Sequence, residues 1–391
     1  MAARMTTRER LWAAMRHEPV DKVPCSPRLG VALNILYDDY ATDATTLALK
    51  AAQPDEIDLD PHFVVSSGVP NIVYSTTDYT CGLDGVRITL SVRDDGGCDL
   101  ITRHIDTPAG PLREVLRKPK PGHPEYGFGP NPAHIERLVK GPDDLPALRC
   151  LVPDPSRYDV GTAYHQLVER IGDDGMAMVC VRSPLDHQAG SVRGIEGLMI
   201  DYYENRVFFD ALVDLFFDKM MAETKALLER GVKVIFGSWY FTSLSVGWSP
   251  AMFRELFLPH LKAQVELVHA YGAGYDYYDD GKVMGILDMI AEAGVDVLET
   301  LTPPPVGDLD LAEAKRRIGD RVCLKGYGDL LYVIKMGTPA DIEAMVAHAM
   351  EVAAPGSGFI FGTSDSIREG TPRDNVRAYF DAARRFGQQA T

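Results

Sequence analysis

Short apolar runs alternate with longer segments of mixed polarity along the chain after about residue 158. The runs have the length and the content of β-branched and aromatic residues expected of buried strands, and the longer segments have the length of helices. Alternating strands and helices predict a parallel sheet. Together with one earlier strand, these units favour a closed barrel, so the predicted fold class is α/β, a single (β/α)8 barrel domain over residues 1–391. The predicted strands are 176–181, 232–236, 274–278, 295–298, 322–325 and 358–361.

Hydroxyl residues mark where several helices are expected to begin. Thr6 and Glu9 have the spacing of a capping box, in which each side chain binds the backbone N–H of the other residue. The pairs Ser249-Pro250, Thr338-Pro339 and Thr371-Pro372 place a hydroxyl N-cap before a proline at the first helical position, which is a strong start pattern.

The first part of the chain has a different pattern. Residues 55–63 are predicted to form an early strand that ends in polar groups. Two β-rich runs on either side of the turn at 94–97 predict an antiparallel insertion over about residues 86–116. The Pro- and Gly-rich residues 119–132 are expected to form a loop.

Composition narrows the class of protein. The apolar fraction is 46%, the charged fraction is 25% and the formal net charge is −16, as in a globular protein that repels nucleic acid. No run reaches the roughly 18 apolar residues that span a bilayer, and the first residues lack the apolar core of a secretory signal. The six cysteines are scattered, without a C-x-x-C pair. We expect a cytoplasmic protein with reduced thiols, and the sequence leaves a homodimer open.

Several common catalytic motifs do not occur. The chain has no P-loop, no G-x-S-x-G and no H-E-x-x-H, and Gly326-Tyr327-Gly328 lacks the third glycine of a dinucleotide-binding turn. Nucleotide binding and serine hydrolysis therefore have no support.

Reactive groups of a (β/α) barrel lie at the carboxyl ends of its strands and on the loops that follow. Tyr278 and Asp280 alternate along one predicted strand end, so both can point to the same side. With Glu299 and Asp365 they could supply oxygen ligands for a metal, or acids and bases. The alternative for Asp279 or Asp280 is a helix cap. The same rule selects Asp60, His62, Arg182, Asp186, His187, Trp239, Tyr240, Lys325 and Ser364.

Each of these additional residues has a structural alternative. Asp186 and His187 are read either as an acid–base or ligand pair or as loop residues bonded to backbone, and Asp60 with His62 is similar. Trp239 and Tyr240 could stack on a flat substrate ring, but aromatic residues at a barrel mouth also serve packing. Lys325 could bind an anion or form an ion pair.

Three stretches resemble the uroporphyrinogen-decarboxylase-like superfamily. They are residues 249–259, residues 281–319 and residues 337–378, with Gly358-Phe-Ile-Phe-Gly-Thr-Ser-Asp-Ser-Ile inside the third. The Arg8-Glu9-Arg10 helix followed by Pro19 to Pro24 also matches, and Thr107-Pro-Ala-Gly-Pro-Leu is similar to a segment of the methyltransferase-like members. The resemblance covers nearly the whole chain and implies the barrel fold.

The resemblance implies one of two activities. Porphyrinogen decarboxylases hold propionates with an arginine-rich N-terminal motif, of which only Arg28 stands here. Cobamide-dependent methyltransferases of the superfamily bind zinc through a His-x-Cys pair and a later Cys. Tyr278, Asp280 and Asp365 stand at those places, so a divalent metal would be held by oxygen atoms of Asp280, Glu299 and Asp365, or by none.

The branch that demethylates small methoxylated aromatics and passes the methyl group to a corrinoid protein fits best. There Asp280, Asp365 and Glu299 would hold a metal or share a proton, and His187 or Tyr278 would protonate the leaving oxygen. Arg28, Asp60, His62, Asp186 and Lys325 would bind substrate, with Trp239 and Tyr240 on either side of its ring. The alternatives are a decarboxylase of another carboxylic acid that uses Arg28, Lys325 and Asp60, and a binding protein without catalysis.

Overall fold

The computed structural model describes residues 4–28, 59–70, 83–120, 132–239, 244–367 and 370–389. The chain divides into two compact units. The first contains residues 1–67, 161–181 and 227–391, and the second contains residues 68–160 and 182–226. Each unit has its own sheet. The assignment of all 391 residues to one domain stays a prediction.

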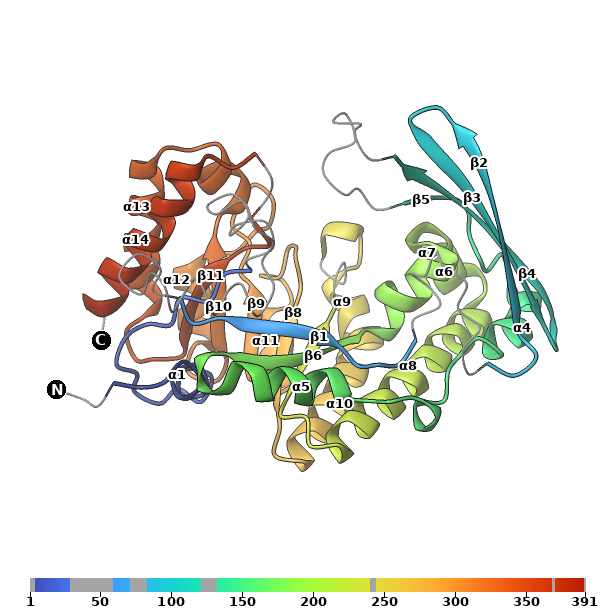
Figure 1. The fold of residues 1–391 in the computed structure, drawn as a ribbon, viewed down its shortest axis with the longest axis horizontal. Helices are drawn as coiled ribbons and strands as arrows, with labels where there is room; N and C mark the ends of the chain where they lie inside the picture. Colours follow the sequence, from blue (N-terminus) through green and yellow to red (C-terminus); the bar gives the residue numbers. More distant parts are fainter. Residues whose placement is uncertain are drawn as a thin grey trace. The chain divides into compact units, whose positions relative to one another are not determined.

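A curled parallel sheet of seven strands forms the first unit, in the order β1-β6-β7-β8-β9-β10-β11 (Figure 1). The six later strands that the apolar runs predict are all present, with ends shifted by a few residues, and neighbouring strands pair in parallel. The strands are β1 (His62–Ser66), β6 (Met176–Arg182), β7 (Val234–Ser238), β8 (Gly274–Tyr278), β9 (Val297–Thr300), β10 (Cys323–Gly328) and β11 (Phe359–Thr363).

Alternation along these strands separates the two faces of the sheet. The inner face carries Met176, Val234, Phe236 and other apolar side chains of one buried cluster. Helix α1 (Thr7–Met15) contributes Leu11, Ala14 and Met15 to that cluster. A Cβ on Gly274, the first residue of β8, would lie 3.2 Å from both Met15 and Trp12. Helix α1 therefore closes the amino-terminal end of the curled sheet.

The segment Pro24–Ser26 lies between the two edges of the sheet. Phe361 of β11 donates its N–H to Pro24, and Ser26 donates to Phe361, at 2.9 and 2.7 Å. On the other side, the N–H of Asp60 donates to the carbonyl of Cys25 at 2.8 Å. The two edges of the sheet are thus joined by three residues that make one isolated bridge. The expectation of eight strands is confirmed for seven, in a barrel-like sheet.

The early strand lies later in the chain than predicted. Strand β1 begins at His62, so Asp60 precedes it and His62 opens it, whereas the sequence placed both residues at its carboxyl end. Residues 55–58 lie outside the described residues. Pro61 explains the shift, because a proline cannot donate to a sheet ladder and is tolerated just before a strand starts.

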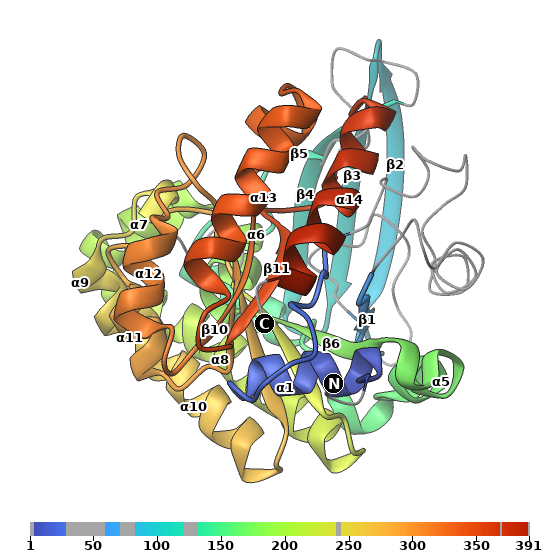
Figure 2. The ribbon, with the colours of Figure 1, turned by 90° about the vertical axis from the view of Figure 1, so that its left-hand side faces the viewer.

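Helices surround the curled sheet, and Figures 1 and 2 show α13 and α14 side by side over β10 and β11. The predicted caps are found at three helix starts: Thr6 forms a capping box with Glu9, Thr338 forms one with Asp341, and Ser249 accepts from Met252 N–H. The remaining helices of this unit are α5 (Thr162–Ile171), α9 (Pro250–Met252), α10 (Leu258–Ala270), α11 (Leu287–Glu292), α12 (Leu311–Ile318), α13 (Pro339–Ala353) and α14 (Arg373–Gln389).

An antiparallel sheet of four strands lies in the second unit and confirms the predicted β insertion. Only the first two of its strands were predicted as separate runs, and the last, β5, pairs with β4 across a bulge at Val115. The strands are β2 (Arg87–Asp95), β3 (Cys98–Thr107), β4 (Gly110–Pro119) and β5 (Ala133–Glu136), and the helices are α4 (Leu145–Arg149), α6 (Gly190–Arg193), α7 (Ile195–Glu204) and the greater part of α8 (Arg206–Glu229). Within the described residues, no helix has the length and apolar content to cross a membrane.

Candidate active site

A buried lysine joins two acids on the inner face of the curled sheet. Lys325, 1% exposed, lies between Asp276 of β8 and Glu299 of β9, with its Nζ 3.1 Å from Asp276 Oδ2 and 2.7 Å from Glu299 Oε2. Burial raises the pKa of Asp276, although Lys325 opposes that shift. Burial works most strongly against ionisation of Glu299, but Lys325, together with His62 and Arg28, outweighs it and lowers the pKa of that carboxyl. Glu299 is therefore the ionised partner of Lys325.

His62 extends this array toward segment 24–26. Its Nδ1 is 2.8 Å from Ser26 Oγ, and its Nε2 is 3.9 Å from Glu299 Oε1. Burial lowers the pKa of His62 to about 3, and the ammonium of Lys325 acts in the same direction. The ring is therefore neutral at physiological pH. It is buried in the interior, where it contacts Ser26 and Glu299.

Arg28 enters the same interior from the first segment of the chain. Its backbone N–H donates to Thr363 Oγ1 at 3.1 Å, which ties it to the end of β11. Its guanidinium carbon lies 4.3 Å from the ring centroid of Tyr278 and 5.2 Å from that of Phe236. Nη1 of Arg28 is buried and has no hydrogen-bond partner among the described residues. Because a buried donor without a partner is costly, this group is suited to an anionic ligand atom.

Tyr278 and Asp280 act as a pair, as their spacing predicted. The hydroxyl of Tyr278 donates to the carboxyl of Asp280. Burial raises the pKa of Asp280 to about 7; the negative charges of Asp365 and Glu299 add to that shift, and Arg28 opposes it. Burial also raises the pKa of Tyr278. Asp280 can therefore carry a proton near neutral pH.

Asp365 follows β11 and faces the same group of charges. Its Oδ1 accepts from the N–H of Ser366 at 2.6 Å, and its charge raises the pKa values of Arg28 and Asp280. The structure thus brings together the predicted residues Arg28, Tyr278, Asp280, Glu299, Lys325 and Asp365, with Asp276 added. We call these seven residues the buried charge cluster.

A divalent metal does not fit the buried charge cluster. Two cations, Arg28 and Lys325, lie among its acids, and Lys325 already occupies an oxygen of Glu299. In the part of the chain that the structure describes, no group of three His, Cys, Asp or Glu side chains is arranged to hold a metal ion. The predicted ligands Asp280, Glu299 and Asp365 form hydrogen bonds or ion pairs within the protein instead. The chemistry considered below therefore uses no metal.

Trp239 is buried against side chains of β8. It is 0% exposed, its Nε1 donates to Tyr275 Oη at 2.7 Å, and that hydroxyl donates to Gln264 Oε1 at 2.6 Å. Its ring stacks on Tyr277, with centroids 6.0 Å apart. Tyr275 and Tyr277 alternate with the inward residues of β8, so Trp239 packs on the outer face of the sheet. The structure gives Trp239 packing contacts, and its predicted ring-binding role stays a prediction.

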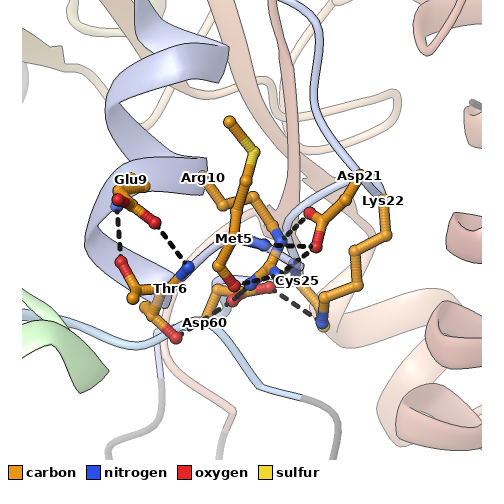
Figure 3. Close-up of polar contacts among 9 residues, drawn as sticks. Met5, Thr6, Glu9, Arg10, Asp21, Lys22, Cys25 and Asp60 are labelled. Carbon is orange, nitrogen blue, oxygen red and sulfur yellow. Dashed lines mark hydrogen bonds and ion pairs between the residues drawn. The ribbon is translucent and has the colours of Figure 1, made fainter. Parts of the chain in front are cut away.

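Asp60 is bound by other side chains and does not lie at the carboxyl end of a strand. It is 1% exposed and binds Arg10 Nη1 at 2.5 Å and Lys22 Nζ at 3.1 Å (Figure 3). Thr7 Oγ1 and the N–H of Cys25 also donate to it. With all these donors, Asp60 anchors α1 to the start of β1, and the predicted substrate contact is not supported.

Three predicted residues remain without a described side chain. Tyr240 lies outside the described residues. Asp186 and His187 belong to a π-helix, Pro184–Ala189, in the second unit, and their side chains lie outside the described part. Their expected roles stay predictions.

Three residues of the site, Asp276, Phe236 and Ser26, were not among those predicted from the sequence. Asp276 could have been found, because it precedes Tyr278 and Asp280 at the same spacing of two along β8. Phe236 is an ordinary apolar strand residue by pattern. Ser26 depends on the contact between segment 24–26 and β1, which no local pattern predicts.

The fold and the cluster define an α/β barrel-like protein with acids and bases inside its ring of strands. A sequence model described as uroporphyrinogen decarboxylase (URO-D) matches residues 125–386, which is more than half of the chain. The chain belongs to this family. A uroporphyrinogen decarboxylase of Synechocystis sp. is 26% identical over 264 residues, which cover 65% of this chain and 71% of the relative. Uroporphyrinogen decarboxylase 2, chloroplastic, of Arabidopsis thaliana is 24% identical over 258 residues, 61% of this chain and 60% of the relative.

A solved structure resembles the whole chain. A methyltransferase from Methanosarcina mazei superposes with a TM-score of 0.63 and 18% identity, and the match covers 98% of this chain and 99% of that one. At this identity the likeness is one of fold.

Proposed function

We propose that this protein is a methyltransferase that takes a methyl group from a small methoxylated donor, such as a methoxylated aromatic acid, and passes it to a corrinoid protein. The fold of the Methanosarcina mazei methyltransferase matches nearly the whole chain, whereas the Synechocystis decarboxylase aligns with 65% of it. The observation that carries the proposal is Asp280, a partly buried acid that holds a proton near neutral pH beside Tyr278 and Arg28.

The residues of this chain would supply binding and a proton. Arg28 binds the negative end of the donor through its guanidinium. When the methyl–oxygen bond breaks, its electrons stay on the oxygen, and Asp280 gives that oxygen its proton. Tyr278 then stabilises the carboxylate that remains, because its hydroxyl already donates to it. The corrinoid partner, as second substrate, supplies the nucleophile that accepts the methyl group.

The test is methyl transfer from 4-methoxybenzoate and related methoxyarenes to reduced cobalamin under anaerobic conditions, read from the cobalamin spectrum and the demethylated product. Loss of a positioned proton donor costs about 10²–10⁴-fold in rate, so we expect Asp280→Asn to fall in that range. Asp288→Asn is the matched control, because Asp288 is an exposed partner of Arg317. A panel of methoxyarenes without methyl transfer, or an unchanged rate in Asp280→Asn, would contradict the proposal.

Decarboxylation is the second candidate, and one observation favours it. Arg28 presents a buried donor suited to a carboxylate, and the curated relatives named above are decarboxylases. In that reaction Arg28 would hold an acid, and Asp280 would protonate the carbon that loses carbon dioxide. Release of carbon dioxide from the same aromatic acids, with no methyl transfer, would favour this activity. Stabilisation by these acids with neither reaction would favour a binding protein.

A further inference from the structure

Arg28 is a cation among acids that do not pair with it. The negative charges of Glu299 and Asp365 act on Arg28. Asp280 acts in the same way, and Asp276 lies in the field of Arg28. Nevertheless no hydrogen bond or ion pair joins these carboxyl groups to the guanidinium among the described residues. A guanidinium and a carboxylate normally form a strong, two-point contact, so the separation requires a cause.

Donors other than Arg28 engage all of these acids. Asp276 and Glu299 are both held by the ammonium of Lys325, at 3.1 and 2.7 Å. Asp280 accepts from the hydroxyl of Tyr278. Asp365 accepts from the N–H of Ser366 at 2.6 Å. Arg28 is left on the faces of two aromatic rings, with Nη1 buried and without a partner among the described residues.

We propose that Lys325 is a positioning residue that keeps Glu299 and Asp276 away from Arg28 and so reserves Arg28 for a carboxylate or similar anion of the ligand. The inference rests on the proposed function only in assigning the negative end of the donor to Arg28. It adds a residue that acts through its neighbours and touches no substrate.

The register of the sheet shows why Lys325 matters most. Glu299 is the register partner of both Tyr278 and Lys325 on its two sides. Arg28 lies on the Tyr278 ring, so Glu299 is one strand away from the guanidinium. Without the ammonium, the carboxylate of Glu299 loses the ion pair that holds it among the described residues. It would then turn toward Arg28, a cation whose charge already acts on it. Arg28 would then form an ion pair with Glu299 and would no longer be available to a ligand.

Calorimetric binding of two probes to the full chain tests this inference. Benzoate carries the anion, and benzamide is its neutral counterpart of the same shape. We expect Lys325→Met to weaken benzoate binding about tenfold or more and to leave benzamide binding unchanged, because only the anion needs Arg28. Arg28→Met should show the same selective loss, and Lys325→Arg should restore binding.

The double variant Lys325→Met/Glu299→Gln separates positioning from direct contact. Removing the acid that would capture Arg28 should return benzoate affinity to within about threefold of the wild type. Lys325→Gln is a second single variant in case Lys325→Met does not fold, because the amide of glutamine can still donate to one carboxylate. It too should weaken the binding of benzoate and leave that of benzamide unchanged. Circular dichroism reports the folding of every variant.

Three results would overturn the inference: wild-type protein that binds no benzoate, Lys325 variants that bind it as the wild type does, or a double variant that stays weak. These outcomes do not depend on methyl transfer. A protein with the expected binding pattern but no methyl transfer would refute the proposed function and leave the role of Lys325 intact.

Discussion

Asp280 shows how a single side chain can acquire chemistry from its surroundings. Burial and two neighbouring carboxylates raise its pKa, while Tyr278 and Arg28 keep the ionised form accessible. Asp288, an exposed acid beside Arg317, has its pKa lowered by the hydrogen bond from that residue. The same residue type is thus an acid in the interior and a plain anion at the surface.

The raised pKa of Asp280 makes a prediction about stability and pH. Its folded-state pKa is about 7, against a usual 3.8, so the folded protein binds this proton more tightly than the unfolded chain. The resulting stability is complete below about pH 4 and is lost as the pH rises through about 7. We expect the unfolding temperature of Asp280→Asn to fall less than that of the wild type between those pH values. Parallel curves of unfolding temperature against pH for the two proteins would refute this prediction.

At the scale of the element, close packing of β7 against β8 sets the outer face of the sheet. A Cβ on Gly237 would lie 2.0 Å from Tyr275 Oη, which links Trp239 to Gln264. We expect Gly237→Ala to lower the free energy of unfolding by about 1–3 kcal/mol in urea denaturation. Gly141→Ala is the control, because no atom lies within 4 Å of its added Cβ, and it should stay within about 0.5 kcal/mol of the wild type. Equal losses in the two variants would contradict the packing argument.

Helix α1 depends on the ion pairs in Figure 3. Arg10 binds both Asp21 and Asp60 there, and Lys22 adds a second cation to Asp60. We expect Asp60→Asn to cost about 3–5 kcal/mol of unfolding free energy, because Lys22 and the buried Arg10 side chain lose the charge of the carboxylate that they share, and among the described residues only Asp21 is left to pair with Arg10. The exposed pair Asp381–Arg384 gives the control: Asp381→Asn should change the same quantity by less than about 1 kcal/mol. A small effect at Asp60 would show that the cluster is not needed to hold α1.

At the scale of the whole molecule, local patterns predicted the strands and several helix starts, because alternation and capping are properties of neighbouring residues. The pairing of Tyr278 with Asp280 followed from the same alternation. The face of Trp239 and the end of β1 that carries His62 were not predictable locally. Both depend on which element packs on each side of the sheet. The contacts of Asp60 were not predictable locally either, because its partners lie 35 to 53 positions earlier in the chain.

Segment Pro24–Ser26 has a consequence for how this protein is made. It joins β11 to the residues just before β1, and Arg28 bonds Thr363 across 335 positions of sequence. The early residues therefore leave the ribosome long before their last neighbour exists. Until β11 has been synthesised, both edges of the sheet lack the hydrogen bonds that join them, and Arg28 has not reached its place. The reactive interior is completed only when residues 24–28 meet β11.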